Sequence, residues 1–260
     1  MWCRGLLLCL LALLICPRGA EAVECRNQDW QGNRYSVCEV APAREDLRLF
    51  LYDPGGAPYG DFSALQARLA GKGQRLAFAM NAGMYHDNRA PVGHYLEDGR
   101  EIMRVIPNAG PGNFGLLPNG VFCIGKRRAR VIETLDYQAR RASLNCRHAS
   151  QSGPMLVIEG ALHPRFLPDS TSRYIRNGVG TTAEGDRAVF VISRNAVSLH
   201  EFASFFRDGL GLPQALYFDG NVSRLYAPQL SRDDWGRPMG PIVGVVEEGA
   251  STQSAALDRP

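Results

Sequence analysis

Short apolar runs, separated by glycine, proline, asparagine and aspartate, make up most of the chain between residues 47 and 246. Runs of this length bounded by turn formers are typical of buried strands. Two of the intervening turns, Pro118-Asn119-Gly120 and Glu184-Gly185-Asp186, resemble hairpin connections. The pattern predicts strands at Leu47–Tyr52, Leu76–Met80, Gly93–Leu96, Phe114–Leu117, Val121–Ile124, Met155–Ile158, Ala188–Ser193, Ala215–Phe218 and Ile242–Val246.

Two segments have the periodicity of amphipathic helices. The first is capped by Asp61 and ends at Gly71, and its apolar face consists of Phe62, Leu65 and Leu69. The second begins with a capping box of Ser198 and Glu201, and its apolar face consists of Leu199, Phe202, Phe205 and Phe206. With few helices among many strands, the sequence predicts a single α+β domain with a mixed, mainly antiparallel sheet.

The first 22 residues have the pattern of a signal peptide. Arg4 precedes the apolar run Leu6–Cys16, and Ala20-Glu21-Ala22 is the small-x-small pattern of a cleavage site, so we expect cleavage after Ala22. A lipoprotein signal at Cys16 is disfavoured because Ile15 precedes it. No later run reaches the roughly 18 apolar residues of a membrane span. We therefore expect a secreted or periplasmic protein without a stable membrane anchor.

The predicted domain covers residues 23–250, followed by a tail, 251–260, that we expect to be disordered. Seven cysteines are present, and three of them precede the cleavage site. The remaining four are Cys25, Cys38, Cys123 and Cys146. An even number in an oxidising compartment predicts two disulfides. Three connectivities are possible, and local closure, Cys25 with Cys38 and Cys123 with Cys146, is favoured.

Charge and motif content argue against several classes of function. The formal net charge of the 260-residue chain is +3, which is too small an excess to indicate a nucleic-acid partner. The basic cluster Lys126–Arg130 follows a glycine and reads as a solvated hairpin. No C-x-x-C motif occurs, and His86-Asp87 alone does not define a coordination sphere, so we expect no metal and no cofactor. The sequence does not indicate an oligomeric state.

At four places an apolar run meets a polar tight turn. Such turns hold side chains on a rigid platform, and their glycines let backbone approach a ligand. We expect the four turns to converge on one pocket. They are Asn81-Ala82-Gly83, Gln151-Ser152-Gly153-Pro154, Arg176-Asn177-Gly178-Val179-Gly180 and Asp219-Gly220-Asn221.

These segments, in this order, resemble the phosphodiester glycosidase family, and most closely its compact exported bacterial members. The resemblance rests on "MNAGMY", "NGVF" at 119–122, "QSGPMLV", "RNGVGTT" and "YFDGNVSRLY", and it spans roughly Leu47 to Val246. Asn81-Ala82-Gly83 replaces an Asn-Gly-Gly of the family, and the glycine-rich loop after Asp219 is shortened. The resemblance therefore implies the fold and the reaction class rather than a particular sugar.

The implied activity is hydrolysis of the bond between a sugar anomeric carbon and a phosphodiester in an envelope or extracellular glycan. This reaction needs a carboxylate for the anomeric centre and a cation for the phosphate. The resemblance gives these catalytic roles to Asp219, as nucleophile or base, and to Arg176. Further substrate-binding candidates are Asn81, Gly83, Gln151, Ser152, Gly178, Gly220 and, as an acid or base, His94.

Other interpretations stay open. Asp219 can simply accept hydrogen bonds in its own turn, and Arg176 can be a structural ion-pair partner. The chain can be a non-catalytic glycan-binding protein that uses Tyr85, Tyr95, Tyr174 and Tyr226 for stacking, or a phosphodiesterase that breaks the P–O bond. A serine hydrolase is disfavoured because Gln151-Ser152-Gly153-Pro154 is not a nucleophile elbow. Five acidic residues beside glycines read as solvated turn residues, although one of them can be the second carboxylate that ordinary glycosidases use: Glu97, Asp98, Glu159, Glu184 and Asp186.

Overall fold

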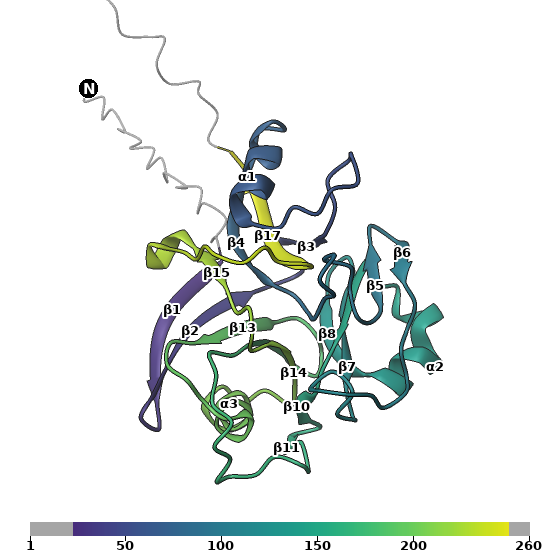
Figure 1. The fold of residues 1–260 in the computed structure, drawn as a ribbon. Coiled ribbons are helices and arrows are strands. Elements are labelled where there is room, and N and C mark those ends of the chain that lie inside the picture. Colours follow the sequence, from purple (N-terminus) through teal and green to yellow (C-terminus); the bar gives the residue numbers. More distant parts are fainter. Residues whose placement is uncertain (1–22, 250–260) are drawn as a thin grey trace, which may run out of the picture.

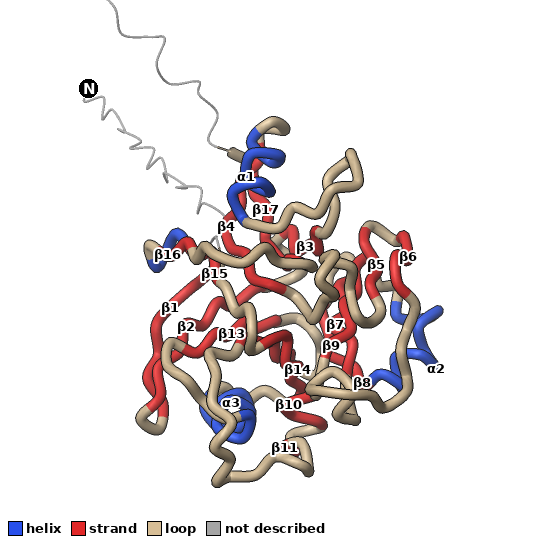
Figure 2. Tube along the Cα trace, in the orientation of Figure 1, coloured by secondary structure: helices blue, strands red, loops and turns tan. Residues whose placement is uncertain are grey.

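Strands are the dominant elements of the structure, a computed structural model that describes residues 23–249 (Figure 2). The predicted signal peptide and tail lie outside these residues. The strands are β1 (Glu24–Trp30), β2 (Asn33–Val40), β3 (Asp46–Phe50), β4 (Gln74–Asn81), β5 (Tyr95–Glu97), β6 (Arg100–Met103), β7 (Gly120–Ile124), β8 (Ala129–Glu133), β9 (His148–Ser152), β10 (Met155–Ile158), β11 (Ala161–Leu162), β12 (Asn177–Thr181), β13 (Ala188–Ser193), β14 (Gln214–Asp219), β15 (Leu225–Ala227), β16 (Arg232–Asp233) and β17 (Ile242–Glu248).

The strands form three sheets, and neighbouring strands in each are antiparallel (Figure 1). The seven-stranded sheet has the order β1-β2-β13-β12-β14-β10-β11. The two five-stranded sheets have the orders β16-β15-β4-β17-β3 and β6-β5-β9-β7-β8. The predicted α+β fold in a single domain, with mainly antiparallel sheet and few helices, is confirmed.

One hydrophobic core joins the three sheets. Phe190 of β13 packs against Phe78 of β4, with ring centroids 4.9 Å apart, and against Phe122 of β7 at 5.7 Å. Phe122 also contacts Phe218 of β14 at 6.2 Å. All four rings are fully buried. Burial of each ring contributes about 1.5–3 kcal/mol, so this cluster fixes how the sheets meet.

Both predicted helices are present. In α1 (Phe62–Ala70) Asp61 accepts a hydrogen bond from the Ala64 N–H at 2.7 Å, and the helix ends at Gly71. The second, α3 (Leu199–Ser204), has the predicted capping box and continues as a π-helical turn, η1 (Phe205–Gly209). A helix that the pattern did not predict, α2 (Thr134–Leu144), is capped by Glu133 and packs on the sheet of β7 and β8. A short 3-10 turn, η2 (Pro228–Leu230), follows β15.

Three predicted features, one strand and two turns, are wrong. Phe114–Leu117 is a folded loop rather than a strand, because Asn119 donates from Nδ2 to the Phe114 carbonyl at 2.8 Å and Leu116 N–H turns back onto Asn113. The Pro118-Asn119-Gly120 segment is consequently not a hairpin turn. Arg176–Gly180 is not a tight turn either, since β12 runs through the middle of the seven-stranded sheet. Its Gly178 is required by packing, as a Cβ there would lie 2.5 Å from the Leu216 carbonyl oxygen of β14.

The predicted disulfides are confirmed. Cys25 and Cys38 are bonded and face each other in the β1–β2 hairpin, and Cys123 at β7 is bonded to Cys146 after α2. The Glu184-Gly185-Asp186 hairpin connects β12 to β13, and the basic residues after Gly125 form the exposed β7–β8 turn. No helix within residues 23–249 is long and apolar enough to cross a membrane.

Candidate functional site

The ends of three strands from two sheets meet around Asp219. Asp219 is the last residue of β14, and it lies opposite Asn177, the first residue of β12. Asn81 ends β4 in the neighbouring sheet, and the Asn177 Nδ2 donates to its Oδ1 at 2.9 Å and to its carbonyl at 3.0 Å. Both asparagines are fully buried. We call the cluster of Asp219, Asn81, Asn177, Tyr85 and Arg224 the Asp219 junction.

The Asp219 carboxylate is held by its own turn and is half-buried. Oδ1 accepts hydrogen bonds from the Gly220 N–H at 2.6 Å and the Asn221 N–H at 2.8 Å, while Oδ2 accepts only one, from Val222 at 3.3 Å. Burial raises the pKa of Asp219 above 3.8, and these backbone donors counteract it only in part. Oδ2 therefore has lone pairs left for a ligand.

Arg176 lies directly beneath this turn but is enclosed by protein. It is 1% exposed, and its Nε and Nη2 donate to the carbonyls of Val197 at 2.8 Å and Ser172 at 2.9 Å. Its Nη1 donates to the Tyr217 hydroxyl at 3.0 Å. A Cβ on Gly220 would lie 2.1 Å from that hydroxyl and 3.4 Å from Nη1, so only glycine fits here. Arg176 and Asp219 are thus brought together without forming an ion pair among the described residues.

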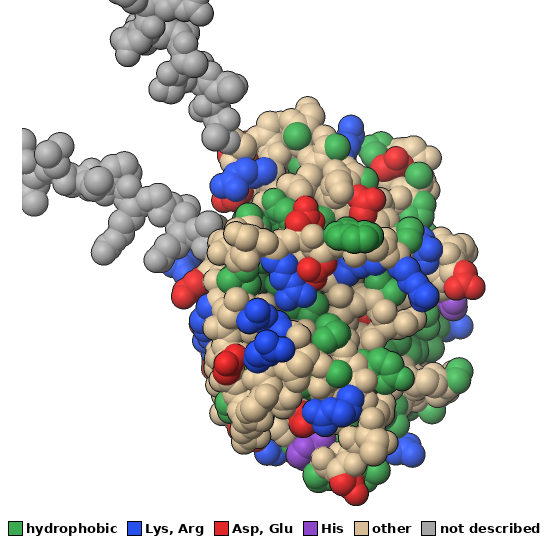
Figure 3. Space-filling model, turned by 60° about the vertical axis from the view of Figure 1, so that its left-hand side comes forward, with side chains coloured by type: hydrophobic (Ala, Val, Ile, Leu, Met, Phe, Trp, Pro, Cys, Tyr) green, Lys and Arg blue, Asp and Glu red, His purple; other side chains and the backbone are tan. Residues whose placement is uncertain are grey.

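The Tyr85 ring lies under the guanidinium of Arg89, whose carbon is 5.5 Å from the ring centre, and Tyr85 is influenced by the charge of Asp219. Burial raises the pKa of the Tyr85 hydroxyl, the Asp219 charge raises it further, and the charges of Arg89, Arg224 and Arg237 lower it. The hydroxyl donates to the Pro238 carbonyl at 3.1 Å. Figure 3 shows basic side chains across the middle of one face of the molecule. A carboxylate and an arginine in one cluster suit a substrate that carries an anion next to the reacting carbon.

His94 and Gln151 belong to a different cluster, on the sheet of β9. The Gln151 Oε1 accepts from the backbone N–H groups of His94 and Ile106, both at 3.0 Å, and its Nε2 donates to the Ile106 carbonyl at 2.7 Å and to Thr134 at 3.2 Å. Thr134 donates in turn to Asn119 at 2.6 Å. All these side chains are buried, and Gln151 has little capacity left for a ligand.

Both ring nitrogens of His94 also have hydrogen-bond partners in the protein. Its Nδ1 donates to the Met103 carbonyl at 2.8 Å, so Nε2 is the acceptor for the Tyr137 hydroxyl at 2.9 Å. Burial lowers the pKa of His94, which favours this neutral form. We call the cluster of His94, Gln151, Asn119, Thr134 and Tyr137 the His94 network.

The remaining predicted site residues lie between the two clusters. Ser152 is fully buried, and its hydroxyl donates to the Phe218 carbonyl at 3.1 Å, next to Asp219. Gly83 has a φ of 139° and packs against Ser150, whose Oγ would lie 2.9 Å from an added Cβ. Both residues shape the backbone near the Asp219 junction, and neither presents a free polar group.

Sequence reasoning missed several residues of the Asp219 junction as site residues. Asn177 stands within a quoted motif, but its contact with Asn81 depends on two sheets meeting. Arg224 stands within the quoted "YFDGNVSRLY" motif, directly after Ser223, and this position was the available signal. Arg89 and Arg237 lie in polar loops with no distinguishing pattern. Of the proposed stacking tyrosines, Tyr95 is fully buried and is excluded from that role.

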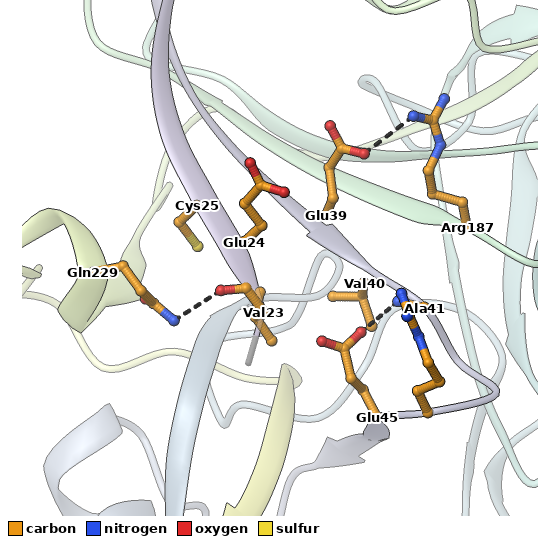
Figure 4. A pocket seen from close by; sticks show the side chains of 10 residues that line it. Val23, Glu24, Cys25, Glu39, Val40, Ala41, Glu45, Arg187 and Gln229 are labelled. Carbon is orange, nitrogen blue, oxygen red and sulfur yellow. Dashed lines mark hydrogen bonds and ion pairs between the residues drawn. The ribbon is translucent and has the colours of Figure 1, made fainter. Parts of the chain in front are cut away.

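Two of the hollows that lie away from the Asp219 junction in the described part of the chain are rivals for a ligand site. One of about 400 Å³ lies beside the β1–β2 hairpin (Figure 4). Two of its carboxylates are engaged, since Glu39 accepts from Arg187 at 3.1 Å and Glu45 accepts from the Ala41 N–H. The other, of about 710 Å³, lies at the start of β14 near Thr181 and Gln214, at the opposite end of the strand from Asp219.

No group of three or more histidine, cysteine, aspartate or glutamate side chains within residues 23–249 is arranged to hold a metal ion. The expectation that the reaction proceeds without a metal or cofactor stays a prediction.

Comparisons with known proteins agree with the fold. Residues 74–246 match the family model described as phosphodiester glycosidase. The chain is 36% identical over 187 residues to uncharacterized protein YigE of Escherichia coli strain K12, which covers 72% of each chain. Among solved structures, the catalytic domain of zebrafish N-acetylglucosamine-1-phosphodiester alpha-N-acetylglucosaminidase, auto-inhibited by its pro-peptide, has a TM-score of 0.59 at 14% identity, with 88% of this chain and 84% of that chain covered.

A hypothetical protein from Synechocystis is similarly related, with a TM-score of 0.57 at 15% identity, 86% of this chain and 61% of that chain being covered. At such low identity the solved structures support the fold alone. The family model covers most of the chain, however, and the Escherichia coli relative is matched over nearly three quarters of it. The chain therefore belongs to the phosphodiester glycosidase family.

Proposed function

We propose that the chain is an exported hydrolase that cleaves the glycosidic bond of a sugar 1-phosphodiester in an envelope or extracellular glycan, with the Asp219 junction as its active site. The observation that carries this proposal is the half-buried Asp219 carboxylate, whose Oδ2 accepts a single long hydrogen bond. Arg224, whose backbone N–H bonds to Asn81 in the same junction, has no carboxylate partner among the described residues. Family membership supports the reaction class, and the two disulfides agree with an oxidising compartment.

The reaction breaks the bond from the anomeric carbon to the phosphate oxygen, and the bonding electron pair leaves with the phosphate. A water oxygen forms the new bond to the anomeric carbon and releases one proton. Asp219 acts either as base for this water or as the nucleophile that water displaces in a second step. The departing phosphomonoester is a weak base, with a second pKa of about 6, so the leaving group needs charge stabilisation more than protonation.

Asn81 and Asn177 position Asp219 in this proposal. Their paired amides tie the start of β12 to the end of β4, and β12 pairs with the end of β14, which fixes the carboxylate relative to the Tyr85 loop. Arg176 has its donors engaged by carbonyls and a tyrosine, so we assign it the role of a fixed cation beneath the turn rather than a direct phosphate ligand. We likewise assign Gln151 and His94 to support of the fold, since their polar atoms bond to protein groups.

Hydrolysis of a chromogenic sugar 1-phosphodiester in heavy-oxygen water tests the proposal. We expect turnover, with the label on the hydroxyl of the sugar anomeric carbon. Label on the phosphate would instead identify a phosphodiesterase that breaks the P–O bond. Saturable binding of the glycan without turnover would identify a binding protein, and either result would contradict the glycosidase.

A further inference from the structure

Arg224 is a buried cation with an unused donor. It precedes β15, is 7% exposed, and its Nη1 is buried without a hydrogen-bond partner among the described residues. Its backbone N–H donates to the Asn81 Oδ1 at 2.9 Å, which places the residue at the Asp219 junction. An unpaired buried donor on a charged group is unfavourable and rare, so it points to a ligand that completes the site.

Neighbouring backbone holds the guanidinium in place. Gly236 has a φ of 135°, and a Cβ there would lie 2.6 Å from the Arg224 Nη2. Only glycine allows the chain to pass this close. The nearby carboxylate of Asp234 is already engaged, since it accepts from Arg232 at 2.7 Å and from the Leu225 N–H at 3.0 Å, while Asp61 caps α1. Neither carboxylate is within ion-pair distance of Arg224 in the described structure.

Two further arginines, Arg89 and Arg237, act with Arg224 on the same tyrosine, Tyr85. The Arg89 guanidinium carbon lies 5.5 Å from the centre of the Tyr85 ring, and Arg89 is held in a left-handed conformation with a φ of 70°. Arg237 lies in the loop that contains Gly236, and its charge also acts on Tyr85. Among residues 23–249 none of the three arginines takes part in an ion pair. The three positive charges outnumber the single negative charge of Asp219 that acts on this tyrosine, so a further anion would reduce their mutual repulsion.

We propose that Arg224, assisted by Arg89 and Arg237, is the binding site for the phosphate group of the substrate. This inference rests on the proposed function and deepens it, because it replaces Arg176 by Arg224 as the direct phosphate ligand. A guanidinium binds two phosphate oxygens through its planar fork. As the bond to the anomeric carbon breaks, negative charge grows on the phosphate, and the fixed cation stabilises that charge.

Calorimetric titration with inorganic phosphate, methyl phosphate and dimethyl phosphate tests the site without any turnover. The three probes distinguish free phosphate, a phosphomonoester and a phosphodiester. We expect saturable binding of at least one, weakened at least about tenfold in Arg224→Gln and less in Arg224→Lys. Arg187→Gln is the matched control, because Arg187 pairs with Glu39 beside the hollow of Figure 4. The Arg187→Gln variant should bind the phosphate probes with the affinity of the wild type.

The proposal is overturned if Arg224→Gln binds all three probes as the wild type does, or if the wild type binds none of them at millimolar concentration. If Arg224→Gln fails to fold, the double variant Arg89→Gln/Arg237→Gln replaces it, since both side chains are less buried. That variant should also lose at least about fivefold in affinity, and unchanged binding would overturn the proposal.

The experiments distinguish a failure of the glycosidase proposal from a failure of the phosphate-site proposal. Phosphate binding that depends on Arg224, together with heavy-oxygen label on phosphate, supports the phosphate site while the glycosidase fails. Label on the sugar, together with an Arg224→Gln variant of unchanged KM and phosphate affinity, leaves the glycosidase standing and overturns the phosphate site.

Discussion

The Asp219 junction and the His94 network are both buried polar clusters built from segments that stand out in the sequence, yet they differ in what their polar atoms bond to. In the His94 network, Gln151 joins the backbone of two loops, and each ring nitrogen of His94 has a protein partner. In the Asp219 junction, Arg224 Nη1 has no partner among the described residues, and Asp219 Oδ2 accepts a single long hydrogen bond. We therefore expect the unfilled groups of the Asp219 junction to serve function, and the filled groups of the His94 network to serve stability.

The largest expected effect is on turnover. We expect Asp219→Asn to lower kcat about a thousandfold, equivalent to about 4 kcal/mol, because an amide cannot act as nucleophile or base. The asparagine oxygen can still accept from Gly220 and Asn221, so the melting temperature should stay near that of the wild type. Asp186→Asn, in an exposed hairpin where the oxygen accepts from Thr182, is the control and should keep full activity. Full activity in Asp219→Asn would contradict the assignment of function to the Asp219 junction rather than to the His94 network.

A substitution in the His94 network should lower the stability of the protein rather than its turnover. We expect Gln151→Leu to lower the free energy of unfolding by about 2–4 kcal/mol, because the N–H groups of His94 and Ile106 lose their shared acceptor. Denaturant titration measures this change. For the folded fraction kcat should stay within about threefold of the wild-type value. A stable Gln151→Leu protein with greatly reduced turnover would instead restore Gln151 as a substrate ligand.

Glu97, in the same sheet as the His94 network, should make the stability of the protein depend on pH. Burial raises the pKa of Glu97, at the end of β5, to about 7. The unfolded chain loses this proton near pH 4.5, so the contribution of Glu97 to stability is lost as pH rises from about 4.5 to about 7. We expect Glu97→Gln to remove this decline and to be more stable than the wild type above pH 7 by about 2–3 kcal/mol. Equal dependence on pH in the two proteins would show that Glu97 is not the titrating group.

At the Asp219 junction the pH dependence should appear in the rate. Because burial raises the pKa of Asp219 above 3.8, kcat/KM should fall as the pH drops through that higher pKa, with a slope approaching about tenfold per pH unit. A pH–rate profile measures the midpoint. An acidic limb centred at or below 3.8 would show that Asp219 does not control the reaction.

The smallest effect is expected from Trp235. This residue precedes Gly236, which contacts Arg224, and its side chain is 92% exposed. We expect it to stack on the substrate, so Trp235→Ala should raise KM about fivefold and leave kcat nearly unchanged. Steady-state kinetics measures the two constants. An unchanged KM would exclude Trp235 from the site, and Leu135→Ala, which removes another exposed apolar side chain, is the control.

The sequence predicted those parts of the fold that depend on local pattern. Asp61 and Ser198 cap the helices as expected, and the cysteines pair locally. It failed where tertiary packing overrides local preference. The two glycines of β12 resemble a turn, but they are required because Leu216 of β14 approaches Gly178, and Phe206 and Leu212 approach Gly180. The polar strand β1 is stabilised by its pairing with β2 rather than by its own pattern.

For the candidate site, too, the sequence indicated the residues in short motifs but not the contacts between distant segments. Asp219 and Asn81 stand in short motifs at strand ends, and the structure brings them together through Asn177. Arg176 is equally prominent in the sequence, but nothing local shows that the carbonyls of Ser172 and Val197 occupy its donors. The Arg224 Nη1 has no partner among the described residues, and the guanidinium fits there only because residue 236, twelve positions further on, is a glycine. Such information depends on contacts between distant segments.

The most direct measurement of where the substrate binds is a crystal structure of the chain with a sugar 1-phosphate. We expect the phosphate within hydrogen-bond distance of Arg224 Nη1 and the anomeric carbon facing Asp219 Oδ2. A ligand bound in the hollow beside the β1–β2 hairpin or in the one near Thr181 and Gln214, with the Asp219 junction unoccupied, would contradict the account.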